Sequence, residues 1–272
     1  MSSNSLRILR LLTTVPVLGL VTHGLVLAQL GVSLSPRQHT PMKFHGLRPD
    51  GSTDSTNWSG YAVTGSAFTQ AKASWIVPTA DCSATPNTYA AFWVGLDGYS
   101  SSTVEQTGTD SDCDGKSPSY YAWYEFYPNP SEVISSVPVS TGNIMSASVS
   151  YSGSEFTVTI TNESTGKSYT KSAKVSGAKR SSAEWIAEAP CCTNSGGILP
   201  LADFGTVSFG LDYTGLSGTN YATDGSSGGS IPISGFSTVE PITMVSSKGV
   251  DEAVPAPLTA DGTSFTVTWK SK

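Results

Sequence analysis

Short runs of β-branched and aromatic residues, each ended by Gly, Ser, Asn, Asp or Pro, follow one another from Asn57 to the end of the chain. Runs of this length, divided by turn residues, are typical of antiparallel strands. Several joins carry turn sequences, among them SGS at 152–154, STG at 164–166 and ADG at 260–262. The pattern predicts an all-β antiparallel sandwich with no helix longer than a turn or two.

The expected domain occupies residues 56–272, because a chain of 272 residues is long enough for one large β domain with its own core. The stretch 215–230, rich in Gly and Ser, is expected to be a long surface loop. The expected strands lie at 58–64, 70–77, 90–97, 103–107, 119–127, 143–151, 154–161, 166–173, 182–188, 205–213, 231–236, 241–246 and 263–270.

The N-terminal region resembles an export signal followed by a linker. Residues 1–28 hold two arginines and then an apolar run that ends near Ala28, which is typical of a secretory signal peptide. An uncleaved membrane anchor is the alternative, although Pro16 and His23 make a poor spanning helix. Residues 29–55 are polar and are expected to form a linker or short propeptide, whose three basic residues could dock on an acidic body. We expect a secreted, extracellular protein.

Charge is divided unevenly along the chain. The part before Asp50 holds five basic and no acidic residues, whereas residues 50–272 hold 10 basic and 21 acidic residues. Nucleic acids and anionic membranes require basic surfaces, so neither is an expected partner of the chain after signal removal. Few basic residues also suit acid conditions, because little positive repulsion accumulates as carboxylates take up protons. We expect a monomer.

All three histidines, His23, His39 and His45, lie within the first 45 residues. If this region is removed, the body has no imidazole, which excludes Ser-His-Asp triads, Cys-His triads and the usual His-containing zinc sites. We expect no metal and no cofactor, so that carboxylates, amides, hydroxyls and cysteines remain for chemistry.

The four cysteines are an even number in a chain with an export signal, so we expect disulfides. Cys82 could pair with Cys113 beside the 103–107 strand, which leaves Cys191 with its neighbour Cys192. Alternatively, Cys82 and Cys113 could each pair with one of Cys191 and Cys192, and such crosswise pairs would tie these loops to the 182–188 strand. The sequence leaves the pairing open.

The stretch SAEWIAEAP at 182–190 contains Glu188, the candidate catalytic base. In a strand, Glu184, Ile186 and Glu188 share one face. In STVEQTG, alternation places Gln106 and Glu105 on opposite faces. Peptide hydrolysis needs a base for water, a donor to the oxyanion and an acid for the departing amine. One Glu and one Gln can supply all three.

Six blocks in the chain together resemble the glutamic peptidases, or eqolisins: NWSGYAV, WIVPTA, FWVGLDG, VEQTG, YAWYEFYP and AEWIAE, in this order. The resemblance spans about residues 57–213. It implies a bent two-sheet β-sandwich of the lectin or glucanase jelly-roll kind. It also implies a secreted endopeptidase that acts on polypeptides at acid pH through a Gln/Glu dyad, without metal or cofactor.

By this similarity, Gln106 matches the dyad glutamine and Glu188 the dyad glutamate. Trp93, Asp97, Trp123 and Glu125 match residues that line the family's cleft, and Tyr127 joins these substrate-binding candidates by alternation along its strand. The chain departs from the fungal pattern at Tyr121, where an acid is common, and in APCCTNSGG after the glutamate. These departures bear on substrate preference and pH optimum.

Structural alternatives exist for several candidates. Glu184 is expected to be a rim or buried acid, and Asp97 and Glu125 could serve structural hydrogen bonding instead of catalysis. The indoles expected in the core are those of Trp58, Trp75 and Trp185. Residues 127–136, which include two prolines, are the candidate for a flap over the substrate.

Two other functions fit an acidic sandwich with aromatic residues in its cleft. A glycoside hydrolase would need paired carboxyls about 5–9.5 Å apart. Glu184 and Glu188 lie about 13 Å apart along a strand, so only a cross-strand pair such as Glu125 with Glu188 would serve. A lectin-like binding module would stack sugar rings on Trp93, Trp123 and Tyr127.

Overall fold

The structure, a computed structural model, describes residues 36–192 and 197–272, all of which belong to one compact unit, Leu34–Lys272. The predicted signal peptide, residues 1–28, lies outside the described residues. Among the helices in the described ranges, none combines the length and apolarity needed to cross a membrane.

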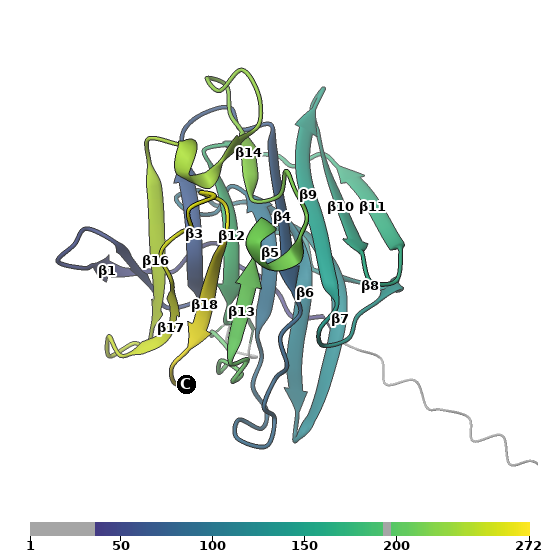
Figure 1. Ribbon diagram of the computed structural model, residues 1–272, viewed down its shortest axis with the longest axis vertical. Helices are drawn as coiled ribbons and strands as arrows, with labels where there is room; N and C mark the ends of the chain where they lie inside the picture. Colours follow the sequence, from purple (N-terminus) through teal and green to yellow (C-terminus); the bar gives the residue numbers. More distant parts are fainter. Residues whose placement is uncertain (1–35, 193–196) are drawn as a thin grey trace, which may run out of the picture. The chain divides into compact units, whose positions relative to one another are not determined.

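The described residues form eighteen strands and two short helical turns, α1 (Leu211–Thr214) and η1 (Ile233–Gly235) (Figure 1). The strands are β1 (Phe44–Leu47), β2 (Thr53–Ser55), β3 (Trp58–Thr64), β4 (Gln70–Ile76), β5 (Ala91–Leu96), β6 (Val104–Asp114), β7 (Ser117–Tyr127), β8 (Glu132–Pro138), β9 (Ile144–Ser152), β10 (Glu155–Asn162), β11 (Lys167–Ala173), β12 (Ser182–Glu188), β13 (Thr206–Phe209), β14 (Tyr221–Thr223), β15 (Ile231–Pro232), β16 (Val239–Val245), β17 (Asp251–Pro255) and β18 (Phe265–Trp269). The all-β prediction is confirmed.

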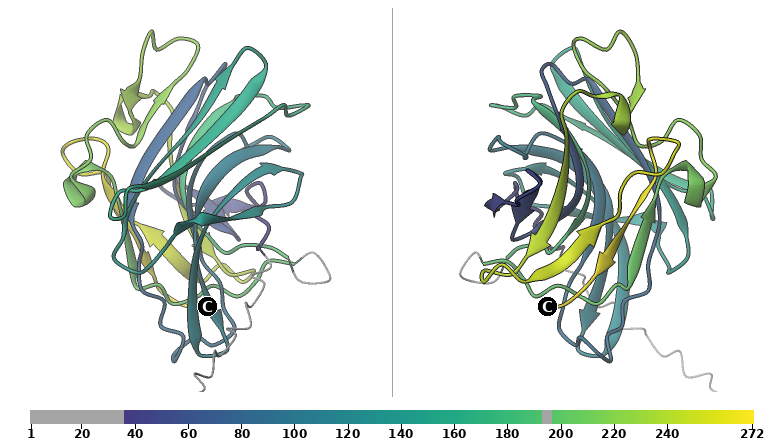
Figure 2. Two further views of the ribbon diagram at one scale, coloured as in Figure 1. Left: turned by 90° about the vertical axis from the view of Figure 1, so that its right-hand side faces the viewer. Right: turned by 60° about the vertical axis from the view of Figure 1, so that its left-hand side comes forward.

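Two antiparallel sheets make up the sandwich (Figures 1 and 2). Sheet 1 has the order β8–β7–β6–β5–β12–β3–β16. Sheet 2 has the order β11–β10–β9–β4–β13–β18–β17. Pairing of β16 with β17 joins the sheets along one edge, and β2 adds to β16 as a parallel strand.

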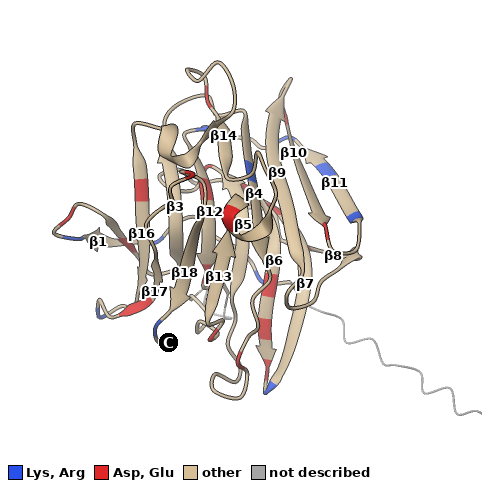
Figure 3. Ribbon diagram, viewed as in Figure 1, with Lys and Arg blue, Asp and Glu red and all other residues tan. Residues whose placement is uncertain are grey.

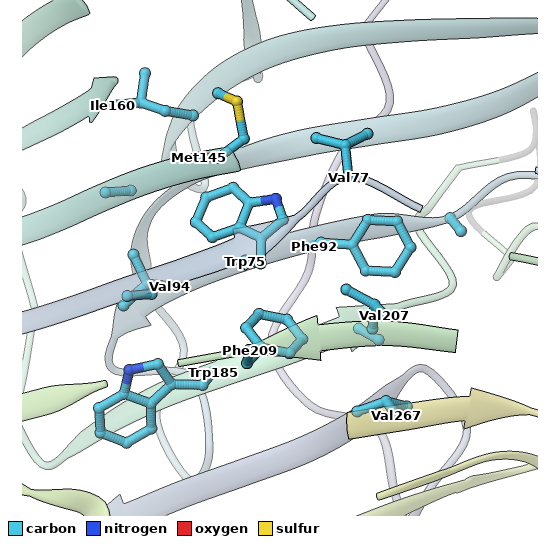
Figure 4. Close-up of a cluster of buried hydrophobic side chains, with 14 of the residues drawn as sticks. Trp75, Val77, Phe92, Val94, Met145, Ile160, Trp185, Val207, Phe209 and Val267 are labelled. Carbon is cyan, nitrogen blue, oxygen red and sulfur yellow. The ribbon is translucent and has the colours of Figure 1, made fainter. Parts of the chain in front are cut away.

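The main hydrophobic core lies between the sheets (Figure 4). Alternation along β12 turns Trp185 into this core, where Trp75 of β4 and Phe209 of β13 are also buried without exposure. Indoles of this kind supply much of the buried apolar area, and truncating one to alanine typically costs about 3–5 kcal/mol. The prediction of a core position is confirmed for Trp75 and Trp185.

The expected strands are found with differences at their ends, except the strand at 231–236. There only Ile231–Pro232 is a strand, and the chain continues as the helical turn η1. β6 continues to Asp114, so that β6 and β7 form one long hairpin. The expected strand 205–213 ends at Phe209, because the next residue, Gly210, has a φ of 93° and turns the chain into α1. The expected surface loop 215–230 contains β14 and the buried Asn220, whose side-chain oxygen accepts from the N–H of Ser74 at 3.2 Å. This part of the loop is therefore packed against β4.

The disulfides join Cys82 to Cys113 and Cys191 to Cys192. The first fastens the loop after β4 to the far end of β6, and the second follows β12 directly. Of the pairings that the sequence allowed, the structure contains the one without a crosswise link.

Candidate active site

Gln106 and Glu188, referred to below as the dyad, lie on strands that flank β5 on its two sides. Gln106 pairs with Gly95, and Glu188 pairs with Ala91. Paired residues in an antiparallel sheet share a face, and the face that carries the dyad also carries a second hydrophobic cluster, separate from the core. We call it the site face. Both dyad side chains are fully buried.

A row of paired residues crosses the site face between the two dyad positions. It runs from Ile186 through Trp93 and Gly108 to Trp123. A Cβ atom at Gly108 would lie 2.5 Å from the Cβ atom of Trp93 and 2.3 Å from a backbone oxygen, so this position requires glycine. The indole of Trp93 donates a hydrogen bond of 2.8 Å to Oε2 of Glu188. Trp93 therefore links this row of paired residues to Glu188.

Glu125 stands opposite Gln106 in the β6–β7 hairpin. Its Oε2 atom lies 3.3 Å from Nε2 of Gln106 and is fully buried with it. The structure thus groups Glu125 with the dyad.

The N-terminal segment, residues 37–42, crosses the site face and covers the dyad. The carbonyl oxygen of His39 accepts from Nε2 of Gln106 at 2.9 Å, and the N–H of Thr40 donates to Oε1 of Glu188 at 3.1 Å. The N–H of His39 donates to Oε2 of Glu125 at 2.9 Å. Both members of the dyad therefore contact one peptide group, that between His39 and Thr40.

The imidazole of His39 lies flat on the indole of Trp123, with ring centroids 3.6 Å apart and an interplanar angle of 9°. Its Nδ1 atom is 3.4 Å from Oε2 of Glu188, and its Nε2 atom is 3.6 Å from Oδ1 of Asp110. The ring is fully buried. Aromatic stacking and two carboxyl groups thus define a pocket for this side chain.

Acidic residues continue along β6 on the site face, where Figure 3 shows red segments. The hydroxyl of Tyr121 lies 2.7 Å from Asp110 and 3.0 Å from Asp112. Arg37 contacts Asp112 at 3.2 Å and Asp114 at 3.6 Å. A basic residue of the N-terminal segment therefore docks on acids of the body, as the sequence allowed.

Burial is the largest cause of the raised pKa values of Glu188, Glu125 and Asp110. Repulsion from Glu125 raises the pKa of Glu188 further, whereas the hydrogen bonds from Trp93 and Thr40 act in the opposite direction. Burial lowers the pKa of the His39 imidazole well below its ordinary value. The covered site therefore favours uncharged forms of its titratable groups.

Asp97 does not share the site face. Its φ of 70° interrupts the alternation that would have placed it beside Trp93. The carboxylate instead accepts from the backbone N–H groups of Lys179, Arg180 and Ser181 at 2.8, 2.7 and 2.9 Å. In this structure Asp97 holds the turn that leads into β12, and no described contact joins it to the dyad.

Glu184 lies toward the other end of β12 from Glu188 and is fully buried. Burial raises its pKa, and the nearby Asp97 and Glu105 raise it further. Glu105 is also fully buried, and burial raises its pKa to about 9. Glu184 thus matches the expectation of a buried acid, and no described contact joins it to the N-terminal segment.

Trp58 and Tyr127 border the site face. Trp58 packs edge-on against Trp93, with centroids 4.8 Å apart, and donates to the carbonyl of Thr40 at 3.1 Å. Trp58 is fully buried, as expected for a core residue, but it lies in the hydrophobic cluster of the site face and not in the main core. Tyr127 is half-buried against the hydrophobic cluster of the site face. Most of the expected flap, residues 127–136, is a turn followed by β8, which pairs with β7.

Sequence reasoning missed His39, Asp110 and Trp58 as residues of the site. Asp110 could have been found, because it lies four residues after Gln106 on a strand and hence on the same face. Nothing in the sequence pattern pointed to His39, because residues 37–42 follow no periodicity and are held by individual side chains.

Residues 56–252 match the model of the Peptidase A4 family. The chain belongs to this family. Aspergillopepsin-2 from Aspergillus niger is 30% identical over 189 residues, and scytalidopepsin B from Scytalidium lignicola is 33% identical over 183 residues. These matches cover 60% and 65% of this peptidase A4 chain. They cover 66% of aspergillopepsin-2, which is just under two thirds, and 68% of scytalidopepsin B.

Solved structures agree with this family assignment. The crystal structure of scytalido-glutamic peptidase with a transition state analog inhibitor has a TM-score of 0.65 at 27% identity and covers 79% of this chain and 98% of that one. Aspergilloglutamic peptidase from Aspergillus niger has a TM-score of 0.55 at 30% identity, and the match covers 67% of this chain and 99% of that one. The resemblance to the glutamic peptidases and the expected sandwich fold of this peptidase A4 chain are confirmed.

Proposed function

We propose that this chain is a secreted endopeptidase that hydrolyses polypeptides at acid pH with the dyad Gln106 and Glu188. One observation carries the proposal: the dyad contacts the oxygen and the nitrogen of a single peptide group, at 2.9 and 3.1 Å. An amide donor at the carbonyl oxygen and a carboxyl group at the nitrogen are what hydrolysis of that bond requires. Membership of the Peptidase A4 family supports the same reaction.

In the proposed reaction, Glu188 takes a proton from water while the oxygen of that water attacks the carbonyl carbon. Nε2 of Gln106 donates to the oxyanion that forms, and loss of one such donor typically costs about 10²–10³ in rate. Oε1 of Gln106 accepts no hydrogen bond from the described residues and can orient the water. Glu188 then returns the proton to the departing nitrogen.

A raised pKa favours the protonated form of Glu188, so a base that works in acid needs a lower pKa than the covered site gives. The largest cause of the raised pKa is burial, and Thr40 of the N-terminal segment is one of the residues that cover this carboxyl group. Once this segment leaves, water reaches the carboxyl group and the pKa falls toward its ordinary value. Uptake of a proton by Glu125 or Asp110 at low pH removes repulsion and lowers the pKa of Glu188 further.

Secretion and a monomeric state belong to the same proposal. The signal-like residues 1–28 and the disulfide between Cys82 and Cys113 fit an oxidising compartment outside the cytosol. No metal or cofactor takes part in the proposed steps.

The test is hydrolysis of an acid-denatured protein by the acid-incubated full chain, compared with Glu188→Gln and Gln106→Glu. Both variants should lose nearly all activity and keep the circular dichroism spectrum of the wild type. Glu184→Gln is the matched control, because Glu184 is equally buried on the same strand and should tolerate the change. Near-normal turnover by Glu188→Gln would refute its role. Cleavage of a polysaccharide, with no cleavage of protein, would favour a glycoside hydrolase instead.

A further inference from the structure

A pocket lies near the end of β12 opposite Glu188. Its walls come from the end of β3, the turns that precede β6 and β12, and the turns on either side of β15, and its volume is about 670 Å³. Ser181 lines this pocket directly before β12, and the extended chain from Ser181 to Glu188 spans about 23 Å. We call it the serine pocket. We infer that it binds a neutral sugar ring, as a carbohydrate site separate from the dyad.

The lining of the serine pocket is rich in hydroxyl groups and poor in charge. Eight of its side chains are Ser or Thr, one is the carboxylate of Asp224, and none is basic. The hydroxyl groups of Ser66, Ser100 and Ser237 make no hydrogen bond within the part of the chain that the structure describes. Free hydroxyl groups both donate and accept, whereas phosphates and carboxylates are bound best by cationic side chains. The pocket therefore suits a neutral ligand with many hydroxyl groups.

Asp224 is oriented so that one of its oxygens remains available to a ligand. Its Oδ1 atom accepts from the N–H and from the hydroxyl of Ser226, both at 2.9 Å. Its Oδ2 atom has only that hydroxyl as a described partner, at 3.2 Å. A Cβ atom at Gly65 would lie 3.1 Å from Oδ2. Because residue 65 is glycine, the space beside Oδ2 stays open, and this oxygen can accept from the hydroxyl groups of a ligand.

Hydrogen bonds keep Asp224 charged in acid. Burial raises the pKa of this carboxyl group, but the hydrogen bonds from Ser226 and Ser227 outweigh burial and hold the pKa below its ordinary value. A charged carboxylate forms stronger hydrogen bonds than a neutral carboxyl group. Sugar hydroxyl groups do not titrate in acid, so sugar binding and the proposed peptidase reaction are compatible with the same acid pH.

One aromatic ring, that of Phe236, completes the lining. The ring is half-buried and packs against Phe68, with centroids 5.8 Å apart and an interplanar angle of 36°. Phe68 is fully buried in the main core and fixes the position of Phe236. A sugar ring has apolar C–H groups on its faces and hydroxyl groups at its edge, so an aromatic surface near a carboxylate matches both.

A metal ion is a poorer match for the serine pocket. Asp224 is the one charged residue of its lining. Within residues 36–192 and 197–272, no three His, Cys, Asp or Glu side chains gather in a way that could hold a metal ion. Sites for Ca²⁺ or Mg²⁺ are usually built from several carboxylate and carbonyl oxygens. The hydroxyl groups of the pocket therefore serve a sugar better than a cation.

The experiment titrates the full-length wild type in mildly acidic buffer with the methyl glycosides of glucose, mannose and galactose, followed by saturation-transfer NMR and calorimetry. We expect saturable binding of at least one sugar. Asp224→Asn should weaken this binding about tenfold or more, because it replaces a charged acceptor with a neutral one. The exposed Asp212→Asn is the control and should bind like the wild type. Absence of saturable binding for all three sugars, or equal affinity in Asp224→Asn, would overturn the inference.

Two further variants test the placement of the sugar. Phe236→Ala removes the aromatic surface and should weaken binding about three- to tenfold. Gly65→Ala adds a methyl group beside Oδ2 of Asp224 and should also weaken binding. Its control is Gly46→Ala, because a Cβ atom at Gly46 meets nothing within 4 Å. Thermal unfolding shows that each variant is folded. Equal affinities in the two alanine variants of glycine would contradict a sugar beside Asp224.

The same sugar ring occurs in free polysaccharides and in glycans attached to polypeptide substrates, and two assays distinguish these sources. Co-sedimentation with an insoluble polysaccharide of the bound sugar, lost in Asp224→Asn, identifies a free polymer. Faster hydrolysis of a peptide that carries the sugar than of the bare peptide, again lost in Asp224→Asn, identifies a glycan on the substrate. Hydrolysis of unglycosylated protein by Asp224→Asn should equal that of the wild type, so a failure of sugar binding is distinguishable from a failure of the proposed function.

Discussion

The indole N–H of Trp93 donates a hydrogen bond of 2.8 Å to Oε2 of Glu188. A donor to a carboxylate stabilises the charged form and so lowers the pKa of that group. Trp58 holds the indole of Trp93 from the side, edge to face. Trp93 therefore tunes the proposed base as well as forming part of the buried cluster on the site face.

The change Trp93→Phe removes this donor and should raise the pKa of Glu188. A hydrogen bond to a charged group contributes about 1.5–3 kcal/mol, so the acid limb of the pH–rate profile should move up by about one to two pH units. The measurement is kcat/KM of the acid-activated enzyme against pH. Trp75→Phe is the control, because it also removes an indole donor, here to Thr109 in the core, and should leave the limb in place. An unmoved limb in Trp93→Phe would show that Glu188 does not set it.

The buried Glu105 should make the folded protein more stable in acid than at higher pH. Its pKa is raised to about 9 by burial, whereas in the unfolded chain it is near 4.3. Between these values the folded state retains a proton that the unfolded state has lost, so the free energy of unfolding falls as pH rises, by about 1.4 kcal/mol per pH unit from this residue. Urea unfolding at several pH values in this range gives the free energy of unfolding as a function of pH. This free energy should fall less steeply with pH for Glu105→Gln than for the wild type. An unchanged slope would contradict the prediction, and the exposed Glu155→Gln serves as control.

Replacement of Asp97 should lower the stability of the fold without directly impairing the proposed reaction. Asp97→Ala leaves three backbone donors, those of residues 179–181, without their acceptor and should lower the free energy of unfolding by about 2–4 kcal/mol. Asp97→Asn retains one acceptor oxygen and should cost less. Chemical denaturation measures both, with the exposed Asp212→Ala as reference. If Asp97→Ala kept full stability and lost activity, Asp97 would belong to the binding site after all.

The disulfide between Cys82 and Cys113 closes a loop with a sequence separation of 31 residues. Replacing both cysteines with serine should lower the free energy of unfolding by about 3–4 kcal/mol, mainly because the unfolded chain gains freedom. Thermal unfolding should show a lower Tm for the double variant, and reduction of the wild type should produce a similar decrease. Equal Tm values for the variant and the oxidised wild type would mean that this link adds no stability.

Strand periodicity explains what the sequence could predict. Alternation along β12 placed Glu188 and Trp185 on opposite faces, and the structure agrees. The same rule failed at Asp97, because a single residue with positive φ ended the regular strand. Periodicity also missed β1 and β2, since their sequences FHGL and TDS hold few β-branched residues and pair mainly with each other and with β16.

The contacts of His39 show a second limit. They join residues 67 to 148 positions apart, through single hydrogen bonds to Gln106, Glu125 and, from Thr40, Glu188. No local pattern encodes such contacts, because they depend on three strands meeting at one place. The chemistry of the dyad could be expected from residue types, whereas the N-terminal segment that covers the dyad could not.

The long β6–β7 hairpin carries one whole wall of the site on a single uninterrupted piece of chain. Gln106, Asp110, Trp123 and Glu125 all lie within residues 104–127, while Glu188 comes from β12. A change of substrate preference could therefore arise by exchange of one short stretch between related genes, with the opposite wall left as it was. Few insertions or rearrangements elsewhere would be needed for such a family to diversify.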